Sequence, residues 1–362
     1  MKPKMLFIAP NMYPGGAESV LVKLLNNIDR DKYDIKLVLI KMEGHHLSKL
    51  PDNLEIIDLK CKKSILAIPR IRKVILKEKP DFIFSIIGQV NLILAILKMI
   101  FFKNICFIGR ENAVYNEWLY KDINFKKRIL SILYHFLLKK LDYIVVQSQF
   151  MEKQVIDYFK VPKNKVVIIN NPIEHNTIKL LMEDNIKNDM WKFDRVNLLA
   201  VGRIEKVKNY FDMVDIIKML PERFHLNILG DGTERLNLEK YIEIKGLNHR
   251  ITLYGYVDNP YKYMRNSFAL LLTSTRESFP NVVIEASACG LYVVSYNMPG
   301  GISEIIKNGI NGSIVPQGQK DKFVIHLTKL LESGYDSKEI IENSKKYSID
   351  IYMEKMYVLF RD

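Results

Sequence analysis

Cysteine is scarce in this sequence, and its distribution excludes two classes of protein. Only three of the 362 residues are cysteines, and neither their odd number nor their wide spacing fits a disulfide framework or a zinc site. The three are Cys61, Cys106 and Cys289. We therefore expect the chain to work in a thiol-reducing compartment.

The sequence also lacks long apolar runs. Its longest apolar stretch, residues 86–102, is interrupted by Gln89, Asn91 and Lys98, whereas a membrane span needs about 20 apolar residues. The apolar run near the start covers only residues 6–10, which is short for the core of a secretory signal peptide. We expect a soluble, cytoplasmic protein that is at most peripheral at the inner face of the cytoplasmic membrane.

Positive charge is in excess and is concentrated in the first half. The net charge is +13, from 54 Lys and Arg against 41 Asp and Glu. Residues 1–190 hold 31 of these cations and 20 of the acids, whereas residues 191–362 hold 23 and 21. This asymmetry suggests that the first half meets lipid headgroups, nucleic acid or a phosphorylated substrate. A solvated, lysine-rich surface is the alternative.

The pattern of apolar segments predicts two α/β domains. Short, β-branched, mostly apolar segments typical of buried parallel strands alternate with longer amphipathic segments typical of helices. The expected strands are residues 5–9, 33–40, 54–59, 81–87, 105–108, 142–147 and 166–169, and then 196–201, 225–229, 251–253, 269–273, 292–295 and 313–315. The expected helices of the first half are residues 17–28, 65–79, 92–102, 125–140 and 150–159. A turn signal and a weakly patterned stretch place the domain boundary within residues 171–195.

Two loops that directly follow expected strands carry groups suited to phosphate. In open α/β sheets ligands bind beyond the carboxyl ends of the strands. Gly15 and Gly16 follow the first strand and precede a helix, which lets backbone N–H groups approach a ligand at a positive helix end. Arg203 and Lys208 follow the first strand of the second domain, and two cations there suit a diphosphate. Taken alone, each loop is also compatible with an ordinary turn.

A third loop carries paired carboxylates. Glu277 follows the expected strand 269–273, and Glu285 lies eight positions later, on a helix that Pro280 can open. Two carboxylates so placed can accept hydrogen bonds from two hydroxylated parts of one ligand, such as a sugar and a ribose. The alternative for Glu285 is a helix-surface carboxylate.

Taken in order, these motifs resemble one enzyme family. The loops at residues 15–18 and 202–209, the Glu277–Glu285 element and the turn at residues 299–304 are similar to those of retaining glycosyltransferase family 4, of the GT-B fold, and the resemblance spans about residues 5–355. It implies two Rossmann-like, doubly wound domains facing across a cleft. Residues 1–172 would bind the acceptor, residues 173–346 the nucleotide sugar, and residues 347–362 would form a helix returning to the first domain.

The resemblance also implies roles for individual residues. The expected activity is transfer of a hexose or N-acetylhexosamine from a nucleotide diphosphate sugar, UDP-linked in many members, with retention and without a metal or other cofactor. Arg203, Lys208 and Glu277 would do the catalytic work on the diphosphate and the donor hexose. The donor-binding residues would be Gly15, Gly16, Gly202, Gly232, Tyr256, Val257, Phe279, Pro280, Asn281 and Glu285.

In one segment the sequence departs from the family. Many members carry a histidine near the donor sugar, after the fourth or fifth strand, where this sequence has Arg110, Glu111 and Asn112. We expect these three to line the acceptor side, and no catalytic base is assigned. The histidines at 45, 46 and 135 are interpreted as surface or packing residues. An Asp-x-Asp pattern at residues 29–31 is interpreted as a turn, not as a metal site.

The basic first half predicts an anionic partner. Residues 60–79 contain eight cations and one acid, and residues 124–142 place cations around an apolar middle. Basic amphipathic helices lie on anionic membranes. We expect a polyprenyl-diphosphate-linked glycan acceptor, as used in O-antigen, capsule or exopolysaccharide assembly, presented at an anionic membrane surface. A core helix with solvated ends is the alternative.

Two other functions remain open at this point. A non-hydrolysing nucleotide-sugar epimerase would share the architecture, but it lacks the Glu277–Glu285 context. A non-enzymatic binder of anionic polymers would explain the charge, but the sequence lacks basic stretches interleaved with aromatics, and we expect no nucleic-acid partner.

Overall fold

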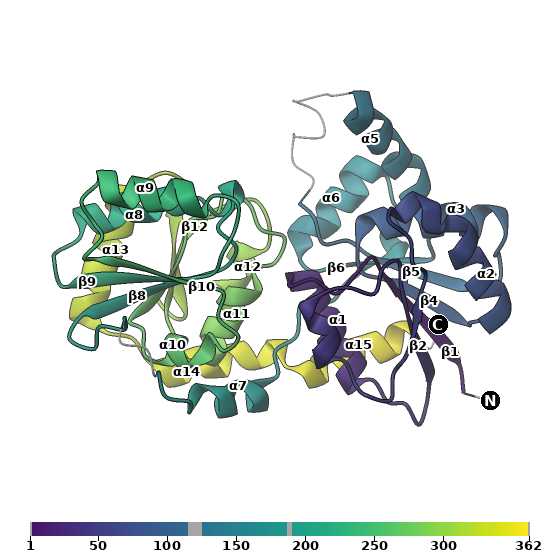
Figure 1. Cartoon of the computed structure of the whole chain (residues 1–362), viewed down its shortest axis with the longest axis horizontal. Helices are drawn as coiled ribbons and strands as arrows, with labels where there is room; N and C mark the ends of the chain where they lie inside the picture. Colours follow the sequence, from purple (N-terminus) through teal and green to yellow (C-terminus); the bar gives the residue numbers. More distant parts are fainter. Residues whose placement is uncertain (1, 115–124, 187–189, 361–362) are drawn as a thin grey trace. The chain divides into compact units, whose positions relative to one another are not determined.

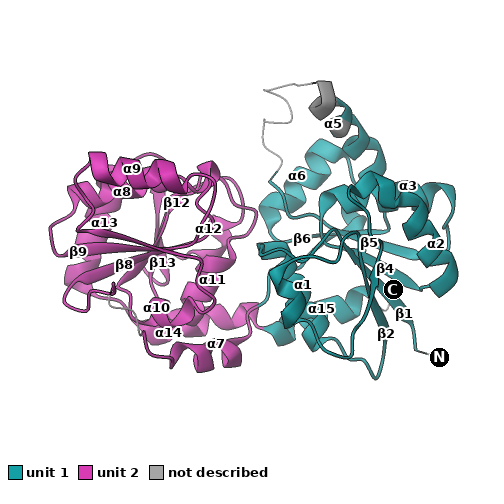
Figure 2. Ribbon diagram, viewed as in Figure 1, with its two compact units in different colours: residues 1–172, 349–362 teal, residues 173–348 magenta. Residues whose placement is uncertain are grey.

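The chain folds into two α/β units, each with its own core (Figure 2). The computed structural model describes residues 2–114, 125–186 and 190–360. Unit 1 comprises Met1–Pro172 together with Ile349–Asp362, and unit 2 comprises Ile173–Ser348. Unit 1 is therefore built from two separate pieces of the chain, and the second crossing lies two residues beyond the 346/347 position expected from the sequence.

Unit 1 contains a seven-stranded parallel sheet whose strand order reverses once. The order is β3-β2-β1-β4-β5-β6-β7, and Leu6 of β1 lies opposite Lys36 of β2 and Ile83 of β4. The strands are β1 (Lys4–Ala9), β2 (Asp34–Leu39), β3 (Glu55–Asp58), β4 (Phe82–Ser85), β5 (Cys106–Arg110), β6 (Tyr143–Val146) and β7 (Val166–Ile168). The reversal between β1 and β4 is a topological switch point, the place where such sheets bind ligands.

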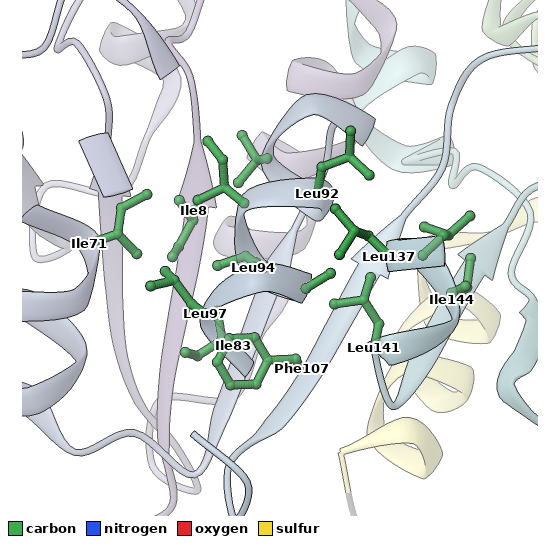
Figure 3. Close-up of a cluster of buried hydrophobic side chains, with 14 of the residues drawn as sticks. Ile8, Ile71, Ile83, Leu92, Leu94, Leu97, Phe107, Leu137, Leu141 and Ile144 are labelled. Atoms are coloured by element: carbon green, nitrogen blue, oxygen red, sulfur yellow. The ribbon is translucent and has the colours of Figure 1, made fainter. Parts of the chain in front are cut away.

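Helices cover both faces of this sheet (Figure 1). They are α1 (Gly16–Asn27), α2 (Ile68–Glu78), α3 (Gly88–Ile100), α5 (Phe125–Leu137), α6 (Gln149–Phe159) and α15 (Ile349–Leu359). Side chains alternate along β1, so that Leu6 and Ile8 join the core under α2, α3, α5 and α6, part of which Figure 3 shows. Phe7, from the same strand, joins the opposite core under α1 and α15. The alternation of a buried strand thus serves two layers of helices.

Unit 2 repeats the same plan with six parallel strands. The order is β10-β9-β8-β11-β12-β13, so its switch point lies between β8 and β11. The strands are β8 (Val196–Val201), β9 (Phe224–Leu229), β10 (Ile251–Gly255), β11 (Ala269–Leu272), β12 (Val293–Asn297) and β13 (Gly312–Pro316). The helices are α7 (His175–Met182), α8 (Tyr210–Met219), α9 (Arg235–Ile244), α10 (Tyr261–Arg265), α11 (Asn281–Ala288), α12 (Ile302–Ile305), α13 (Lys320–Ser333) and α14 (Ser337–Ser344).

The doubly wound α/β class predicted from the sequence is confirmed in both units, with differences at the helices. Helix α3 begins at Gly88, four residues before the expected start, because Gln89 and Asn91 lie within it rather than ahead of it. Helix α7 occupies a segment for which no helix was expected. Within the described ranges, no helix combines the length and apolarity that crossing a bilayer requires.

Candidate active site

The predicted cationic loop lies at the switch point of unit 2. Gly202 and Arg203 leave β8, and a short 3₁₀ turn, Lys206–Lys208, precedes α8. Asn209, in the left-handed region at φ 50°, ends the turn and donates through Nδ2 to Asp212 Oδ2 at 2.9 Å. The Tyr210 hydroxyl donates to the Gly202 carbonyl at 2.8 Å. Both ends of the loop are therefore fixed to α8.

Lys208 and Glu277 form an ion pair across this switch point. Lys208 Nζ lies 2.5 Å from Glu277 Oε1, and the Ser274 hydroxyl donates to the same oxygen at 2.9 Å. The two side chains remain 21% and 16% exposed. The pair comes together because β8 and β11 are adjacent strands, although its residues lie 69 positions apart. A charge pair that still touches solvent can exchange partners when an anionic, hydroxylated ligand arrives.

Threonines after β11 hold the two loops together. The Thr273 hydroxyl donates to the carbonyl oxygens of Lys208 and Asn209, at 3.2 and 2.8 Å. The Thr275 N–H donates to the Val207 carbonyl at 2.8 Å. These two threonines and Ser274 were not among the residues predicted from the sequence. A run of hydroxylated residues directly after a fully apolar strand was the signal that could have revealed them.

Glu277 is also held from its other side by the turn after β12. Its N–H donates to the Pro299 carbonyl at 3.1 Å. Gly300 packs so closely that a Cβ added there would lie 1.5 Å from the Glu277 carbonyl oxygen, and its φ is +129°. Only glycine fits such a contact. The backbone of Glu277 is therefore fixed by two neighbouring loops.

Arg203 follows Gly202 directly after β8. Its side chain is exposed and makes no ion pair among the residues that the structure describes. Lys206 is also exposed. It is the first residue of the 3₁₀ turn, whereas Lys208 is the last. The structure thus brings Lys208 and Glu277 into contact, and it places Arg203 just after β8, the strand that also precedes Lys208.

Glu285 lies in the helix that follows Glu277, as the fifth residue of α11. Phe279 and Pro280 are buried, and α11 begins at Asn281. The half-buried Glu285 lies beside Tyr261, whose phenol pKa is raised, first by this carboxylate and then by burial. Burial, followed by the same carboxylate, also raises the pKa of the Cys289 thiol. Glu285 thus lies near two groups that stay neutral at pH 7, the Tyr261 phenol and the Cys289 thiol.

The remaining donor-side predictions lie at the same edge of the sheet. Gly232 follows β9, and a Cβ added there would lie 2.4 Å from the Ile204 carbonyl oxygen, which is too close for any residue but glycine. Tyr256 and Val257 follow β10 and are respectively exposed and half-buried. The loops after β9 and β10 are joined by the Gly230 N–H, which donates to the Gly255 carbonyl at 2.7 Å. All predicted donor residues of unit 2 therefore lie beyond strand carboxyl ends, and their roles stay predictions.

In unit 1 the Gly15–Gly16 loop lies at the other switch point. Gly15 precedes α1 in an extended conformation and provides no side-chain cap. The Glu18 carboxylate folds back against Gly15, within 2.3 Å of where a Cβ would be. The structure therefore places both glycines at a helix start, with an acidic side chain close by.

Arg110 and Glu111, expected on the acceptor side, are buried in unit 1. They are 2% and 0% exposed, whereas Asn112 is half-buried. Arg110 Nη2 donates to Asn171 Oδ1 at 2.6 Å, and Asn91 Nδ2 donates to Glu111 Oε1 at 2.6 Å. Burial lowers the pKa of Arg110. Arg110 Nε and Nη1 are buried with no hydrogen-bond partner among the described residues, and the acceptor role of the three residues stays a prediction.

The other polar candidates have structural settings. Asp29, Arg30 and Asp31 lie in a turn between α1 and β2, as predicted. His45 is exposed, His46 is buried and His135 lies 3.2 Å from the Tyr158 carbonyl. Across the described part of the chain, no three His, Cys, Asp or Glu side chains are grouped as metal ligands. Action without a cofactor stays a prediction.

Two family models together match most of the chain. The model described as Glycosyltransferase Family 4 matches residues 14–177. The model described as Glycosyl transferases group 1 matches residues 182–347. The border between the two matches falls close to the start of unit 2.

Curated proteins and a solved structure are similar to this chain. An uncharacterized glycosyltransferase of Methanocaldococcus jannaschii, MJ1059, is 29% identical over 258 residues, covering 67% of this chain and 62% of that protein. The N-acetylgalactosamine-N,N'-diacetylbacillosaminyl-diphospho-undecaprenol 4-alpha-N-acetylgalactosaminyltransferase of Campylobacter jejuni is 27% identical over 335 residues, covering 88% of this chain and 87% of that protein.

A lipopolysaccharide 1,6-galactosyltransferase of Salmonella typhimurium is 26% identical over 229 residues, covering 62% of this chain and 60% of that protein. The crystal structure of HepE of Anabaena in complex with UDP and glucose has a TM-score of 0.81 and 17% identity, covering 99% of both chains. That structural likeness establishes the fold.

Proposed function

Since its two halves match Glycosyltransferase Family 4 and Glycosyl transferases group 1, the chain belongs to the glycosyltransferases, and we propose that it moves a hexose or N-acetylhexosamine from a UDP-sugar to a lipid-diphosphate-linked glycan. We propose that transfer proceeds with retention and without a metal. The observation that carries the proposal is the solvent-accessible Lys208–Glu277 pair at the switch point of unit 2. The UDP in the HepE structure supports the choice of nucleotide.

Each charged group of unit 2 has a chemical task in this proposal. The Arg203 guanidinium and the Lys208 ammonium bind the diphosphate, the first as a fork and the second as a point charge. Glu277, held by two loops, accepts hydrogen bonds from hydroxyls of the donor sugar. Glu285, on α11, accepts them from the ribose. Exchange of the Lys208–Glu277 contact for contacts to the donor keeps every charge partnered.

The cations matter most as the bond to the diphosphate breaks. Negative charge grows on the leaving phosphate while positive charge grows on the sugar ring. Fixed cations aimed at the phosphate stabilise this transition state more than the ground state. Losing one such contact typically costs about 3 kcal/mol, or roughly 100-fold in rate.

Nucleotide release tests the proposed reaction. The protein is incubated with UDP- and GDP-linked sugars, with and without a synthetic polyprenyl-diphosphate sugar. We expect release from a UDP-sugar that rises strongly when the acceptor is present. Donor conversion that needs no acceptor would instead identify an epimerase. Thermal stabilisation by an oligonucleotide but by neither UDP nor GDP would contradict the enzyme assignment.

A face of unit 1 supports the lipid-linked acceptor and a membrane surface. The Campylobacter relative acts, by its name, on a diphospho-undecaprenol substrate. In this chain the 3₁₀ turn Ser64–Ala67 before α2, the C-terminal end of α3 and one side of α5 expose apolar side chains, and α3 contacts both of the other elements. We call this set the apolar-basic face. Its apolar members include Ile65, Leu66, Met99, Ile100, Phe101, Ile132, Leu133 and Phe136.

Cations lie among these apolar side chains. The Arg72 guanidinium lies 4.5 Å from the centre of the Phe101 ring, and Lys139 Nζ lies 5.4 Å from that of Phe136. Phe101 is 49% exposed and Phe136 58% exposed. An exposed ring beside a cation suits the lipid interface, where the ring enters the acyl boundary and the cation meets phosphate. We propose that this face docks unit 1 on anionic membranes.

Liposome co-sedimentation tests the docking face. We expect binding to vesicles with phosphatidylglycerol at low salt, weaker binding at high salt, and none to vesicles of phosphatidylcholine alone. The I100E/F101E variant should lose binding. Leu236, 71% exposed on unit 2, gives the matched control L236E, which should bind like the wild type. Absence of binding at low salt would sink the docking proposal.

A further inference from the structure

An exposed aromatic side chain stands at the ligand edge of unit 1. Tyr13 is 52% exposed and lies in the loop that leaves β1, two residues before Gly15. The residue before it, Met12, is completely buried and anchors the loop in the core. The Tyr13 ring is therefore carried on a fixed base at the switch point between β1 and β4, although its own face is open to solvent.

The ring is held by the loop that leaves β2. The Tyr13 hydroxyl donates to Glu43 Oε2 at 2.9 Å, and Glu43 Oε1 lies 2.5 Å from Lys41 Nζ. A tyrosine hydroxyl is protonated at neutral pH, and Glu43 raises the pKa of Tyr13 further, chiefly through this hydrogen bond.

Backbone contacts join the two loops beneath the ring. The Met12 N–H donates to the Glu43 carbonyl at 2.7 Å, and the Met12 carbonyl accepts from the His46 N–H at 2.9 Å. Gly44, at φ +118°, packs so tightly that a Cβ would lie 2.1 Å from the Met12 carbonyl carbon. Asp58 of β3 fixes the second loop in turn, because its Oδ1 accepts from the Met42 N–H at 3.2 Å. These contacts fix the backbone beneath the ring before any ligand arrives, which lowers the entropic cost of binding one.

We infer that Tyr13 is the stacking platform for the sugar of the acceptor, with Glu43 and Lys41 as its polar rim. This inference rests on the proposed function, which requires unit 1 to hold a glycan. A pyranose ring presents C–H groups on one face and hydroxyls around its edge. The negative face of an aromatic ring attracts those C–H groups, while a carboxylate and an ammonium at the ring edge bind hydroxyls.

The charge around the ring favours a neutral sugar over a phosphate. Glu43 lies directly at the Tyr13 hydroxyl, and its carboxylate would repel a phosphate brought to the same place. Lys41 is already paired with that carboxylate. The diphosphate of the acceptor therefore has to bind elsewhere, and Tyr13 contributes to the choice of the acceptor sugar.

Steady-state kinetics test the platform. With donor saturating, we expect Y13A to raise the KM for the polyprenyl-diphosphate sugar about tenfold, equivalent to about 1.4 kcal/mol. The KM for the donor should change by less than about twofold. Y13F keeps the ring and loses only the hydrogen bond to Glu43, so its KM for the acceptor should lie between those of Y13A and the wild type. Y158A, which removes another half-exposed tyrosine of unit 1, is the matched control and should match the wild type.

A second readout does not depend on turnover. Saturation-transfer difference NMR with methyl hexosides and methyl N-acetylhexosaminides should give a sugar signal in the wild type that Y13A loses and Y158A keeps. An unchanged acceptor KM in an active Y13A, an equal rise in the donor KM, or a sugar signal that is absent from the wild type or unaffected by Y13A would overturn the inference. Failure of the proposed function gives a different result, because the wild type would then release nucleotide from none of the nucleotide sugars tested.

Discussion

The carboxyl ends of the two sheets carry charged residues of opposite accessibility. In unit 2, Lys208 and Glu277 keep 21% and 16% of their side chains exposed, and Arg203 is exposed as well. In unit 1, Arg110 and Glu111 are 2% and 0% exposed and bind neighbouring asparagines. The same fold thus uses similar side chains in two ways.

The difference separates groups that stabilise the fold from groups that can bind. A buried charge relies on partners within the protein, and removing them is costly. Arg110 has one such partner, Asn171, while its Nε and Nη1 have none among the described residues. A partly exposed pair such as Lys208 and Glu277 can accept a ligand, because water already competes for its hydrogen bonds. At the edge of unit 1, Tyr13 is 52% exposed, whereas Arg110 is 2% exposed, so the proposed platform is the more accessible of the two side chains.

The largest expected effect is at Lys208. K208A should lower kcat/KM for the donor about 100-fold or more, because a cation aimed at the leaving phosphate is lost. The melting temperature should change little, since Glu277 keeps its hydrogen bond from Ser274 and its access to water. Initial rates of nucleotide release and a thermal melt measure the two quantities.

Lys206 supplies the matched control. It lies in the same 3₁₀ turn and is exposed, but it makes no ion pair within the described residues. K206A should retain activity within about twofold of the wild type. Equal losses in both variants would mean that general positive charge, not the position of Lys208, drives the reaction.

At the edge of unit 1 the corresponding change should affect stability. Asn91 is completely buried and binds Ser85, the Arg110 carbonyl and Glu111. N91A leaves a buried carboxylate without this donor, which should lower the free energy of unfolding of unit 1 by about 3 kcal/mol. Hydrogen exchange of amides in β4 and β5 measures the loss.

Asn104 provides the comparison for this variant. It is an exposed asparagine of unit 1, so N104A should change stability by no more than about 0.5 kcal/mol. UDP binding to N91A, measured by calorimetry, should equal that of the wild type. A large fall in UDP affinity without a change in exchange rates would place the Asn91 cluster in the donor site.

The smallest expected effect is a pH dependence of the stability of unit 2 that arises at His225. His225 of β9 is buried, with Nε2 2.8 Å from Thr252 Oγ1, and burial lowers its pKa from 6.5 to about 4. The unfolded chain then binds a proton that the folded chain refuses, so stability falls as pH drops below 6.5 and keeps falling toward pH 4. From pH 7 to pH 6 the loss should be about 0.7 kcal/mol.

Hydrogen exchange in β9, corrected for the intrinsic effect of pH, reports this loss. The H225N variant does not titrate in this range, so it should show a flatter dependence. A loss of the same size in H225N would assign the pH dependence to other groups.

The strands could be predicted more closely than the helices. A segment apolar on both faces, such as 5–9 or 269–273, has few alternatives in a chain of this class. Asn91 looked like an interruption before α3, yet it lies inside the helix because its amide finds partners in β4 and β5. Helix α7 was missed because it is eight residues long, has no side-chain cap and buries only Ile178.

The candidate site could be predicted residue by residue, but its pairing could not. Arg203, Lys208 and Glu277 each follow a strand, and the sequence reveals that much. The contact between Lys208 and Glu277 depends on β8 and β11 being neighbours, which is a property of the strand order. The burial of Arg110 and Glu111 depends on partners 61 and 20 positions away, and no local pattern encodes it.

The return of the chain to unit 1 at Ile349 has a consequence for biosynthesis. Met356, Leu359 and Phe360 belong to the same core as the first strand, so unit 1 begins to leave the ribosome before unit 2 and is completed after it. Unit 2 is continuous in sequence and can close while unit 1 still exposes an apolar surface. A nascent chain stalled or truncated near residue 348 would therefore present that surface to chaperones and proteases, even though its second domain was already folded.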